Sequence, residues 1–417
     1  MTMIAGRSDI ATDPGILLTG GTGFLGGEIL ARLLERDDRP VYLLIRAPSE
    51  RAAAARLRKT LTSLLGAAEP WSQRVTAVAA DLTKPGLAMS AARRRWLAER
   101  TESIIHCAAS VSFTLGLSES RAINVAGTSR LLDLAALCAF RGGLECFTHV
   151  STAYVAGTHR GCFTERNLDL SQDFRNPYER TKFEAETLVL KRSRSLPVQV
   201  LRPSIVVGDS RTGWTPSFNV LYWPLRAFAR GAYPAIPAKR SAPADVVPVD
   251  YVADAVLGLA GRPGTTYHLT AGGRTSSVGE VIDLAADYLR RPSPRVISPA
   301  VYRRTVHPLL LRSATEARRR ALNHSEAFFP YFAIDTHYDD ALAREALSVQ
   351  GIEAPPLGSY FSTLMDFALQ ADWGRRPVRR VHRPVVPASA RDAPPRLAAQ
   401  PRDSLLSTGS LGSSIRS

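Results

Sequence analysis

The sequence Gly15-Ile-Leu-Leu-Thr-Gly20-Gly-Thr-Gly23-Phe-Leu-Gly26 joins a short apolar run to the start of a helical pattern. Of its glycines, Gly20 allows a tight turn, Gly23 lets the backbone approach a pyrophosphate, and Gly26 lets strand and helix pack closely. The amide groups at a helix N-terminus also attract anions. The stretch therefore predicts a phosphate-binding loop. The loop residues that we expect to contact the phosphates are Gly20, Thr22, Gly23, Phe24, Leu25 and Gly26.

Strand and helix patterns alternate from this loop to about residue 207. Apolar runs of strand length occur at Gly15–Thr19, Val41–Ile45, Val75–Ala79, Ser103–His106, Cys146–Val150 and Val198–Leu201. Amphipathic or Ala-rich helical patterns lie between them, at Leu25–Glu35, Glu50–Leu65, Ala91–Arg100, Ala122–Phe140 and Tyr178–Arg192. Such alternation predicts a parallel sheet with helices on both faces. The predicted fold class is therefore α/β, a doubly wound Rossmann sheet.

The composition divides the chain into four parts. Residues 1–14 read as an N-terminal extension, 15–210 as the nucleotide-binding domain, and 211–372 as a smaller substrate-binding cap with a C-terminal helical region. Within the third part, a strand–helix pair at 245–260 is expected to return to the nucleotide-binding domain. Residues 373–417 are rich in Pro, Ser and Arg and lack periodicity, which predicts a disordered basic tail.

The charge of the chain is strongly basic, but it is unevenly distributed. The 417 residues carry a formal net charge of +15, and 45% of them are apolar, which is globular composition. Only five of the basic residues are Lys, and the segment Arg375–Ser417 holds nine Arg and two Asp, a net +7. The rest of the chain carries the remaining +8, so we expect no nucleic-acid partner.

Cysteine content and hydropathy exclude several other classes of protein. Four Cys in so long a chain do not make a disulfide scaffold, and their spacing matches no zinc finger, so no metal is expected. Residues 1–13 lack the apolar segment of a signal peptide. No uninterrupted apolar run approaches the roughly 18 residues that span a bilayer. The expectation is a cytoplasmic protein without a transmembrane segment, and its oligomeric state stays open.

The end of the second predicted strand indicates which dinucleotide the loop serves. NAD enzymes place Asp or Glu there to bind the ribose 2′-OH, whereas NADP enzymes offer Arg to the 2′-phosphate. Here Ile45 is followed by Arg46, and the first acidic residue is Glu50. The planar fork of Arg suits phosphate. The pattern favours NADP(H), with a solvated surface arginine as the alternative.

A candidate catalytic group follows the fifth strand. Tyr178 and Lys182 are four residues apart at the start of a predicted helix, so they share one face. A nearby ammonium favours the phenolate, so Lys182 is expected to ease proton exchange by Tyr178. Ser151 and Thr152 close the preceding strand, where a hydroxyl can hydrogen-bond a developing oxyanion.

Together these residues resemble the extended short-chain dehydrogenase/reductase family, and within it the thioester reductase and fatty acyl-CoA reductase (male-sterility-like) branch. The resemblance covers about residues 15 to 290. Its stretches are Thr19–Gly26, Leu43–Arg46, Asp81–Ser90, His106–Ala109, Asn124–Thr128, Val150–Val155, Asn176–Glu186, Leu201–Gly208 and Asp250–Asp254.

The resemblance implies a role for each matching residue. Thr152 would be the oxyanion-binding hydroxyl, Tyr178 the proton donor, and Lys182 the cation that binds the ribose. Tyr178 and Lys182 thus also count as cofactor contacts. The other implied contacts are Asp81 and Leu82 at the adenine, Ala108 and Ala109 along the diphosphate, Asn124 supporting the Lys and a water, and Pro203, Ser204 and Ile205 near the nicotinamide.

The implied function is NADPH-dependent reduction of an acyl thioester, on CoA or an acyl carrier protein, to an aldehyde or an alcohol. One alternative is an extended-family dehydrogenase or epimerase that acts on a free carbonyl or alcohol, such as a hydroxysteroid or a nucleotide sugar. Arg46 disfavours an epimerase, because epimerases hold NAD. The other alternative is a non-catalytic NADP-sensing protein. Such proteins commonly lose the Tyr or the Lys, and both are present here.

Other residues leave two interpretations open. Cys107 replaces the Asn or Gly common in the family and reads as a small buried residue rather than a thiol nucleophile, because the sequence places no general base for it. His106 and His149 read as satisfied core residues.

The aromatic residues that form either an acyl-binding cap or simple core are Trp214, Phe218, Tyr222, Trp223 and Phe228. The segments Phe328–Phe332 and Tyr338–Leu347 resemble the closing segment of acyl reductases and predict a C-terminal helical lid.

Overall fold

The computed structural model describes residues 14–218, 220–231, 235–312, 316 and 328–380. All of them belong to one compact unit, residues 1–382. The predicted N-terminal extension, apart from Pro14, and the tail beyond residue 380 lie outside the described residues.

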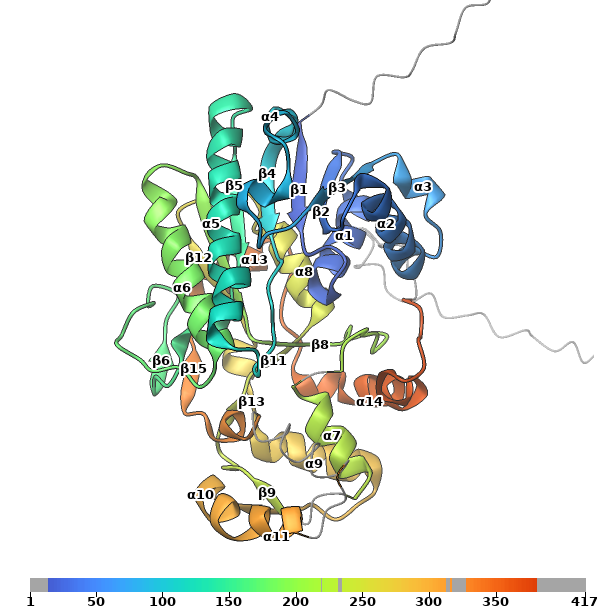
Figure 1. Ribbon diagram of the computed structural model, residues 1–417. Helices are drawn as coiled ribbons and strands as arrows, with labels where there is room; N and C mark the ends of the chain where they lie inside the picture. Colours follow the sequence, from blue (N-terminus) through green and yellow to red (C-terminus); the bar gives the residue numbers. More distant parts are fainter. Residues whose placement is uncertain (1–13, 219, 232–234, 313–315, 317–327, 381–417) are drawn as a thin grey trace, which may run out of the picture. The chain divides into compact units, whose positions relative to one another are not determined.

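The centre of the fold is a seven-stranded parallel sheet with strand order β12-β7-β5-β4-β1-β2-β3 (Figure 1). The chain builds one half outward from β1, then crosses back to β4 and builds the other half. A crevice at the carboxyl ends of β1 and β4 follows from this reversal. The strands are β1 (Gly15–Thr19), β2 (Val41–Arg46), β3 (Val75–Ala80), β4 (Thr101–His106), β5 (Cys146–Val150), β7 (Val198–Pro203) and β12 (Thr266–Leu269).

Helices cover both faces of the sheet, as the alternating pattern predicts. On β1, Leu18 packs into a core with α1, α2 and α8, while the adjacent Leu17 packs into the opposite core with α4, α5 and α6. Alternate side chains of a strand point to opposite faces, so both cores need apolar residues from each strand. The helices are α1 (Phe24–Arg36), α2 (Glu50–Leu65), α4 (Ala91–Ala98), α5 (Leu117–Arg141), α6 (Pro177–Lys191) and α8 (Val249–Gly258).

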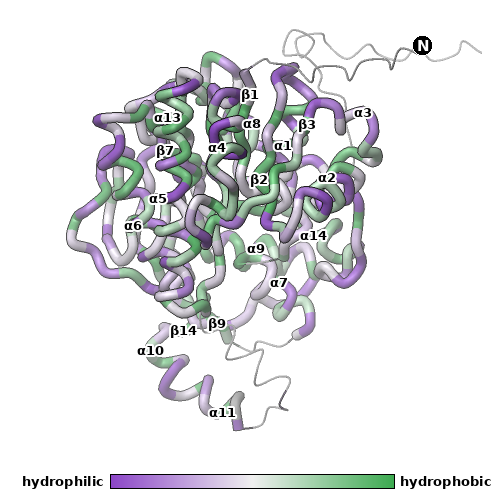
Figure 2. The backbone as a smooth tube through the Cα atoms, turned by 45° about the horizontal axis from the view of Figure 1, so that its top comes forward, coloured by the Kyte–Doolittle hydropathy of each residue, from purple (hydrophilic) through white to green (hydrophobic). Residues whose placement is uncertain are grey.

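Most of the remaining elements gather at one end of the sheet (Figures 1 and 2), whereas α3 (Glu69–Ser72) packs against β3 and α13 (Ala341–Ser348) packs against β12. A separate apolar core joins α7, α9 and α14 through residues such as Leu225, Val281 and Leu364. The strands are β6 (Gly161–Phe163), β8 (Ile205–Val207), β9 (Ala235–Pro237), β10 (Pro243–Ala244), β11 (Val246–Pro248), β13 (Ser276–Ser277), β14 (Arg295–Ile297) and β15 (Thr336–Tyr338). The helices are α3 (Glu69–Ser72), α7 (Tyr222–Ala229), α9 (Val278–Leu289), α10 (Pro299–Val301), α11 (His307–Arg312), α13 (Ala341–Ser348) and α14 (Phe361–Gln370), with single turns at η5 (Tyr302–Val306), η6 (Phe329–Ala333) and η8 (Asp372–Gly374).

The predicted strands and helices of the Rossmann part are confirmed, with small differences at their ends. The largest is at α5, which begins at Leu117 and not at Ala122, because its first turn is polar and carries no apolar pattern. In the strand–helix pair at 245–260, α8 does return to the first domain and packs against α1. Its strand β11 does not join the main sheet, since it pairs with β8.

Helix α5 is, among the described residues, the one helix long and apolar enough by length and composition to cross a membrane. It also packs against the sheet, where Leu131, Leu132, Ala135 and Cys138 are buried in the core. The core helix of a soluble protein passes the same test, so this finding is weak evidence for a membrane span.

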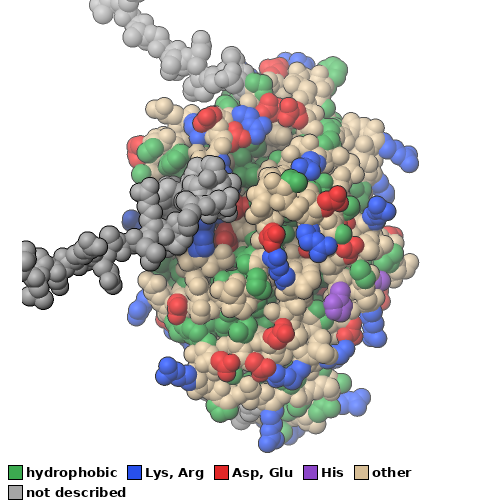
Figure 3. All heavy atoms as spheres, turned by 180° about the vertical axis from the view of Figure 1, so that it is seen from behind, with side chains coloured by type: hydrophobic (Ala, Val, Ile, Leu, Met, Phe, Trp, Pro, Cys, Tyr) green, Lys and Arg blue, Asp and Glu red, His purple; other side chains and the backbone are tan. Residues whose placement is uncertain are grey.

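The surface charge is mixed over the face shown in Figure 3, where Lys and Arg side chains stand singly among Asp and Glu. No cluster of three or more His, Cys, Asp or Glu that could hold a metal ion occurs within the described part of the chain.

The predicted start of the tail at residue 373 is too early. Trp373 is buried, and the carbonyl of Val378 accepts a hydrogen bond from Trp214 Nε1 at 3.2 Å. Arg380 donates to Glu28 at 2.9 Å and to Glu35 at 3.1 Å, both on α1. Because these partners lie far apart in sequence, no local pattern reveals that residues 373–380 are part of the fold. We call them the C-terminal strap.

Replacing Arg380 with Ala should destabilise the protein. Glu28 is only 1% exposed, so the substitution removes charged hydrogen bonds from a buried carboxylate. We expect the free energy of unfolding to fall by about 2–3 kcal/mol, measured by denaturant unfolding. Arg379→Ala is the matched control, because the neighbouring Arg379 is exposed. Equal stability of the two variants would show that the strap contributes nothing.

Candidate active site

The glycines of the phosphate loop have the roles expected of them. Gly20 has a positive φ of 78°, and a Cβ there would lie 2.8 Å from the backbone nitrogen of Ala108. A Cβ on Gly26 would collide with the carbonyl oxygen of Gly20, whereas a Cβ on Gly23 would meet only that oxygen, at 3.2 Å. Gly20 and Gly26 therefore hold the turn tight, and Gly23 leaves its surroundings open to a ligand.

The first turn of α1 is ready to receive an anion. Its N-cap residue is Gly23, and no side chain caps its amide groups. Uncapped amides at a helix N-terminus form a site for phosphate. Ala108, which follows β4, lies beside this turn and donates its amide to Thr19 Oγ1 at 3.1 Å. The cradle therefore fits the diphosphate of a dinucleotide, as the sequence predicts for Ala108 and its neighbour Ala109.

An arginine that sequence reasoning missed lies next to Arg46. Arg46 is exposed at the end of β2. Arg56, on α2, donates to the carbonyl of Arg46 at 3.2 Å and to Thr22 Oγ1 of the phosphate loop at 3.1 Å. Two guanidinium groups thus stand where an adenosine 2′-phosphate is expected. In an Arg-rich helix, no local signal distinguished Arg56 from a surface residue.

The predicted adenine contacts lie just beyond the end of β3. Asp81 Oδ1 accepts hydrogen bonds from the backbone and hydroxyl of Thr83, at 2.9 and 2.7 Å. The carbonyl of Leu82 accepts from Arg130 at 2.9 Å. These bonds fix the turn after β3 beside the end of β2.

The structure brings the three predicted catalytic residues together. Thr152 follows β5, and Tyr178 and Lys182 lie on α6, whose N-terminus is capped by Asn176. The Thr152 side chain lies close enough to the Tyr178 hydroxyl to influence its pKa, and Thr152 Oγ1 donates to the carbonyl of Pro203 at 3.3 Å. Lys182 Nζ donates to the carbonyl of Val150 at 2.8 Å. The carboxyl end of β5 and the first turns of α6 therefore form one site.

Ser151 has a different role from Thr152. Its hydroxyl donates to Glu186 at 2.5 Å and is buried. Only Thr152 of this pair belongs to the candidate catalytic group.

Burial sets the protonation of the catalytic pair. It raises the pKa of Tyr178 to about 12, against the opposing effect of the Thr152 side chain. It lowers the pKa of Lys182 to about 8. Tyr178 is therefore a neutral hydroxyl near pH 7 and can donate a proton. Lys182 Nζ donates to the carbonyl of Val150, and the expectation that Lys182 eases proton exchange by Tyr178 stays a prediction.

Cys107 lies close enough to this pair to interact electrostatically with both residues. Burial raises the pKa of its thiol to about 11, so the thiol stays protonated near neutral pH. A protonated thiol is a poor nucleophile. Cys107 is half-buried, and its protonated thiol supports the prediction that it is not a nucleophile.

The two core histidines differ from each other. His106 is hydrogen-bonded to Thr19 and Thr128, at 2.8 and 2.9 Å, and burial lowers its pKa to about 3. His149 is buried as well, but neither of its ring nitrogens has a hydrogen-bond partner among the described residues. The prediction of a satisfied core histidine is therefore wrong for His149.

Asn124 joins two elements of the site, and its implied support of Lys182 and a water stays a prediction. Its amide donates to Ser110 and to Thr181, at 3.1 and 3.0 Å, so it ties the loop after β4 to α6. No hydrogen bond joins it directly to Lys182 in the described structure. Pro203 ends β7, Ser204 follows it and Ile205 begins β8, at the same edge of the sheet as Thr152.

An aromatic wall closes the site on the side away from the phosphate loop. The ring of Phe113 lies 5.7 Å from that of Tyr178, 5.2 Å from Tyr331 and 5.4 Å from Phe328. The hydroxyl of Tyr331 donates to Glu179, the residue after Tyr178, at 2.6 Å. The sequence predicts a lid at residues 328–332. It does not predict the role of Phe113, because no motif surrounds this residue.

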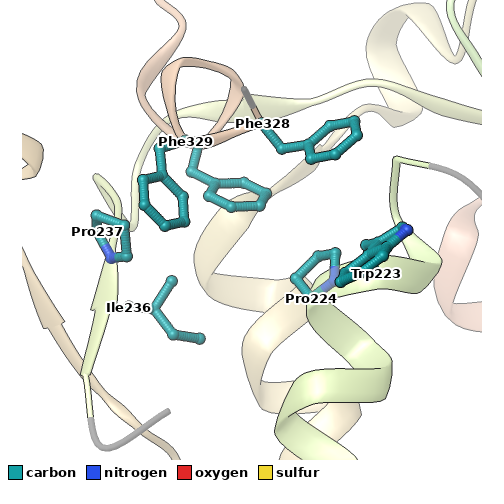
Figure 4. A pocket seen from close by; sticks show the side chains of 7 residues that line it. Trp223, Pro224, Ile236, Pro237, Phe328 and Phe329 are labelled. Atoms are coloured by element: carbon teal, nitrogen blue, oxygen red, sulfur yellow. The ribbon is translucent and has the colours of Figure 1, made fainter. Parts of the chain in front are cut away.

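Phe328 also lines an apolar pocket, in which side chains from α7, β9 and η6 face one another (Figure 4). Its lining residues are Trp223, Pro224, Ile236, Pro237, Phe328, Phe329 and Phe332. Of the five aromatic residues expected in the cap, Trp223 alone lines this pocket. Trp214, Tyr222 and Phe228 are buried core instead, and Phe218 stacks on Phe367. The spacing of these five aromatic residues in the sequence could not distinguish residues that line a pocket from residues that are buried in the core.

Known proteins resemble this chain over most of its length. Fatty acyl-CoA reductase 1 of Xenopus laevis is 31% identical over 301 residues, which cover 62% of this chain and 58% of that protein. The chain thus matches somewhat more than half the length of such reductases. The isonitrile lipopeptide synthase of Streptomyces coeruleorubidus is 34% identical over 284 residues, 66% of this chain and 19% of the synthase.

Solved structures agree with the sequence comparisons. The terminal R domain of the myxalamid PKS-NRPS pathway superposes with a TM-score of 0.74 at 28% identity, covering 89% of this chain and 97% of the domain. The reductase domain of a non-ribosomal peptide synthetase from Mycobacterium tuberculosis, at 23% identity and a TM-score of 0.66, covers 87% of this chain and 92% of that domain, and shares the fold.

The family match covers the phosphate loop, the catalytic residues and all of the sheet except β12 and the start of β1. Residues 18–256 match the family described as male sterility protein, which is more than half of the chain. With its dinucleotide cradle and its Thr-Tyr-Lys group in place, the chain is a member of the male sterility protein family, in the extended short-chain dehydrogenase/reductase branch that binds a nicotinamide cofactor.

Proposed function

We propose that this protein reduces acyl thioesters, carried on CoA or on a carrier protein, to an aldehyde or an alcohol with NADPH. The observation that carries the proposal is the proximity of Tyr178 and Thr152, which lie between a dinucleotide cradle and an aromatic wall that leads to an apolar pocket. The similarity to fatty acyl-CoA reductase 1 and to the myxalamid R domain supports the same substrate class.

The residues of the site divide the chemistry between them. The cofactor, when bound, supplies the hydride. Thr152 and Tyr178 offer hydroxyl groups to the thioester oxygen, where negative charge develops. Tyr178 then donates its proton to that oxygen. The resulting hemithioacetal collapses, which releases a thiol and an aldehyde. Lys182, buried and fixed by Val150, is positioned to bind the ribose.

The choice of NADPH rests on Arg46 and Arg56. A guanidinium forms bidentate, charge-assisted hydrogen bonds with a phosphate. No acidic residue stands at the end of β2, where an NAD enzyme binds the 2′-OH. The bond between Arg56 and Thr22 joins the 2′-phosphate position to the phosphate loop.

The apolar pocket is the proposed site of the acyl chain. Tyr178, Phe113 and Phe328 form a continuous series of ring contacts from the reacting hydroxyl to the pocket. Its lining is almost entirely hydrocarbon, which favours an apolar acyl chain over a sugar.

Tyr178→Phe should abolish turnover while cofactor binding stays intact. The variant loses the proton donor, so we expect kcat to fall by about 10²–10⁴-fold. Turnover is measured as NADPH consumption and free-thiol release with an acyl-CoA, and binding as NADPH fluorescence. Tyr288→Phe, which removes a surface hydroxyl bonded to Asp366, is the control. Unchanged turnover in Tyr178→Phe would exclude the catalytic role.

Arg46→Ala and Arg56→Ala should each reduce the preference for NADPH. Losing a hydrogen bond between charged groups costs about 1.5–3 kcal/mol, so KM for NADPH should rise about 10- to 150-fold. KM for NADH should stay the same, because NADH lacks the 2′-phosphate. Arg58→Ala, on the same helix and exposed, is the matched control. If neither variant changes the NADPH/NADH ratio, the 2′-phosphate is bound elsewhere.

Ile236→Phe should narrow the pocket and select for shorter acyl chains. The ratio of kcat/KM for palmitoyl-CoA to that for butyryl-CoA should fall about tenfold or more, since pocket fit is worth about 1–3 kcal/mol. Ile352→Phe, outside the pocket, controls for the added bulk. An unchanged ratio with full activity would place the acyl chain elsewhere, and the thioester chemistry would still stand.

A further inference from the structure

The chain contains one long stretch that is basic without any acidic residue. Between Asp287 and Glu316 there are six Arg and no Asp or Glu. The described part of this stretch comprises the end of α9, then β14, and then a continuous helical segment from α10 through η5 to α11. We call residues 290–312 the arginine segment.

All six arginines of this segment are exposed: Arg290, Arg291, Arg295, Arg303, Arg304 and Arg312. None of them forms an ion pair with a carboxylate of the described residues. Other exposed arginines of the fold, such as Arg121 and Arg240, do pair, with Glu184 and Asp283. The segment thus presents positive charge that no neighbouring carboxylate neutralises.

The same surface exposes aliphatic side chains. Val301 is 51% exposed and Leu309 is 62% exposed, so two aliphatic side chains of the helical segment face outward. Its other side is anchored, because Tyr302 and His307 are buried and their rings lie 5.3 and 6.4 Å from Phe329. The outward side therefore combines cationic and apolar groups.

The arginine segment also supports the wall of the apolar pocket. Its strand β14 pairs with β9, which supplies Ile236 and Pro237 to the pocket. Phe329 contacts Tyr302 on one side and lines the pocket on the other. In Figures 1 and 2, α10 and α11 lie at the end of the folded unit away from the seven-stranded sheet.

We propose that the arginine segment binds the surface of an anionic lipid bilayer. Unpaired arginines attract anionic headgroups, and exposed aliphatic side chains enter the boundary between headgroups and acyl chains. An acidic protein would also be attracted to the arginines. The bilayer is favoured because exposed Val301 and Leu309 gain from hydrocarbon, and because the adjacent pocket accepts hydrocarbon as well. The contact would place the pocket near membrane-dissolved acyl substrates.

Flotation of the full chain with vesicles tests the proposal. We expect binding to phosphatidylcholine vesicles that contain about 30% phosphatidylglycerol, weak binding to pure phosphatidylcholine, and loss of binding at 1 M salt, where the Debye length is about 3 Å. The triple variant Arg303→Glu, Arg304→Glu, Arg312→Glu should partition at least about tenfold less, since each basic residue near the surface contributes about 1 kcal/mol. Val301→Ser with Leu309→Ser should also weaken binding.

The control carries the same charge change on another surface. Arg58→Glu, Lys59→Glu and Arg95→Glu replace exposed residues of α2 and α4 and should keep vesicle binding. Equal binding by the two triple variants would overturn the proposal. It would also be overturned if the arginine-segment variant kept vesicle binding but lost its affinity for an acyl carrier protein, which would identify a carrier surface. Vesicle binding is measured without turnover, so failure of the thioester reaction leaves this test unaffected.

Discussion

The position of the catalytic helix depends on one buried ion pair. Arg202 of β7 and Glu186 of α6 are 1% and 0% exposed and 2.6 Å apart. A buried charge pair is tolerated only when its remaining hydrogen-bonding groups are also satisfied. Here Ser151 donates to Glu186, and Arg202 also contacts His268 and the Asn167 carbonyl. This arrangement fixes α6 against three strands, and Lys182 and Tyr178 lie one and two turns earlier on the same helix.

The N-terminal end of α6 is held by the cap region, residues 211–372. Asn176 caps α6 and donates to the hydroxyl of Tyr331, which itself donates to Glu179. Two attachments, one at each end, therefore hold Tyr178 between the sheet and the aromatic wall. The cap thus helps to form the site as well as to cover it. A cap joined in this way can change its lining residues while Tyr178 stays in place.

Much of this arrangement could be predicted from local sequence, and the remainder has a physical reason for being hidden. The phosphate loop, the alternation of strands and helices, and the spacing of Tyr178 and Lys182 are short-range patterns. The contacts of Arg56, Phe113 and Arg380 are set by residues distant in the chain, so nothing around them marks their role. His149 illustrates another limit. Burial can be read from a strand pattern, but hydrogen-bond partners depend on which side chains the neighbouring helices present.

The arginines of the chain fall into groups that differ in what neutralises their charge. Arg32 and Arg202 lie in the core and are neutralised by carboxylates, so they add nothing to the external field. Arg46 and Arg56 are exposed beside the phosphate loop, where a bound dinucleotide would supply the opposite charge. The arginine segment has no such partner in the described fold. Its charge therefore needs a counterpart from outside the chain, and the apolar groups beside it make an anionic lipid surface a better counterpart than solvent ions alone.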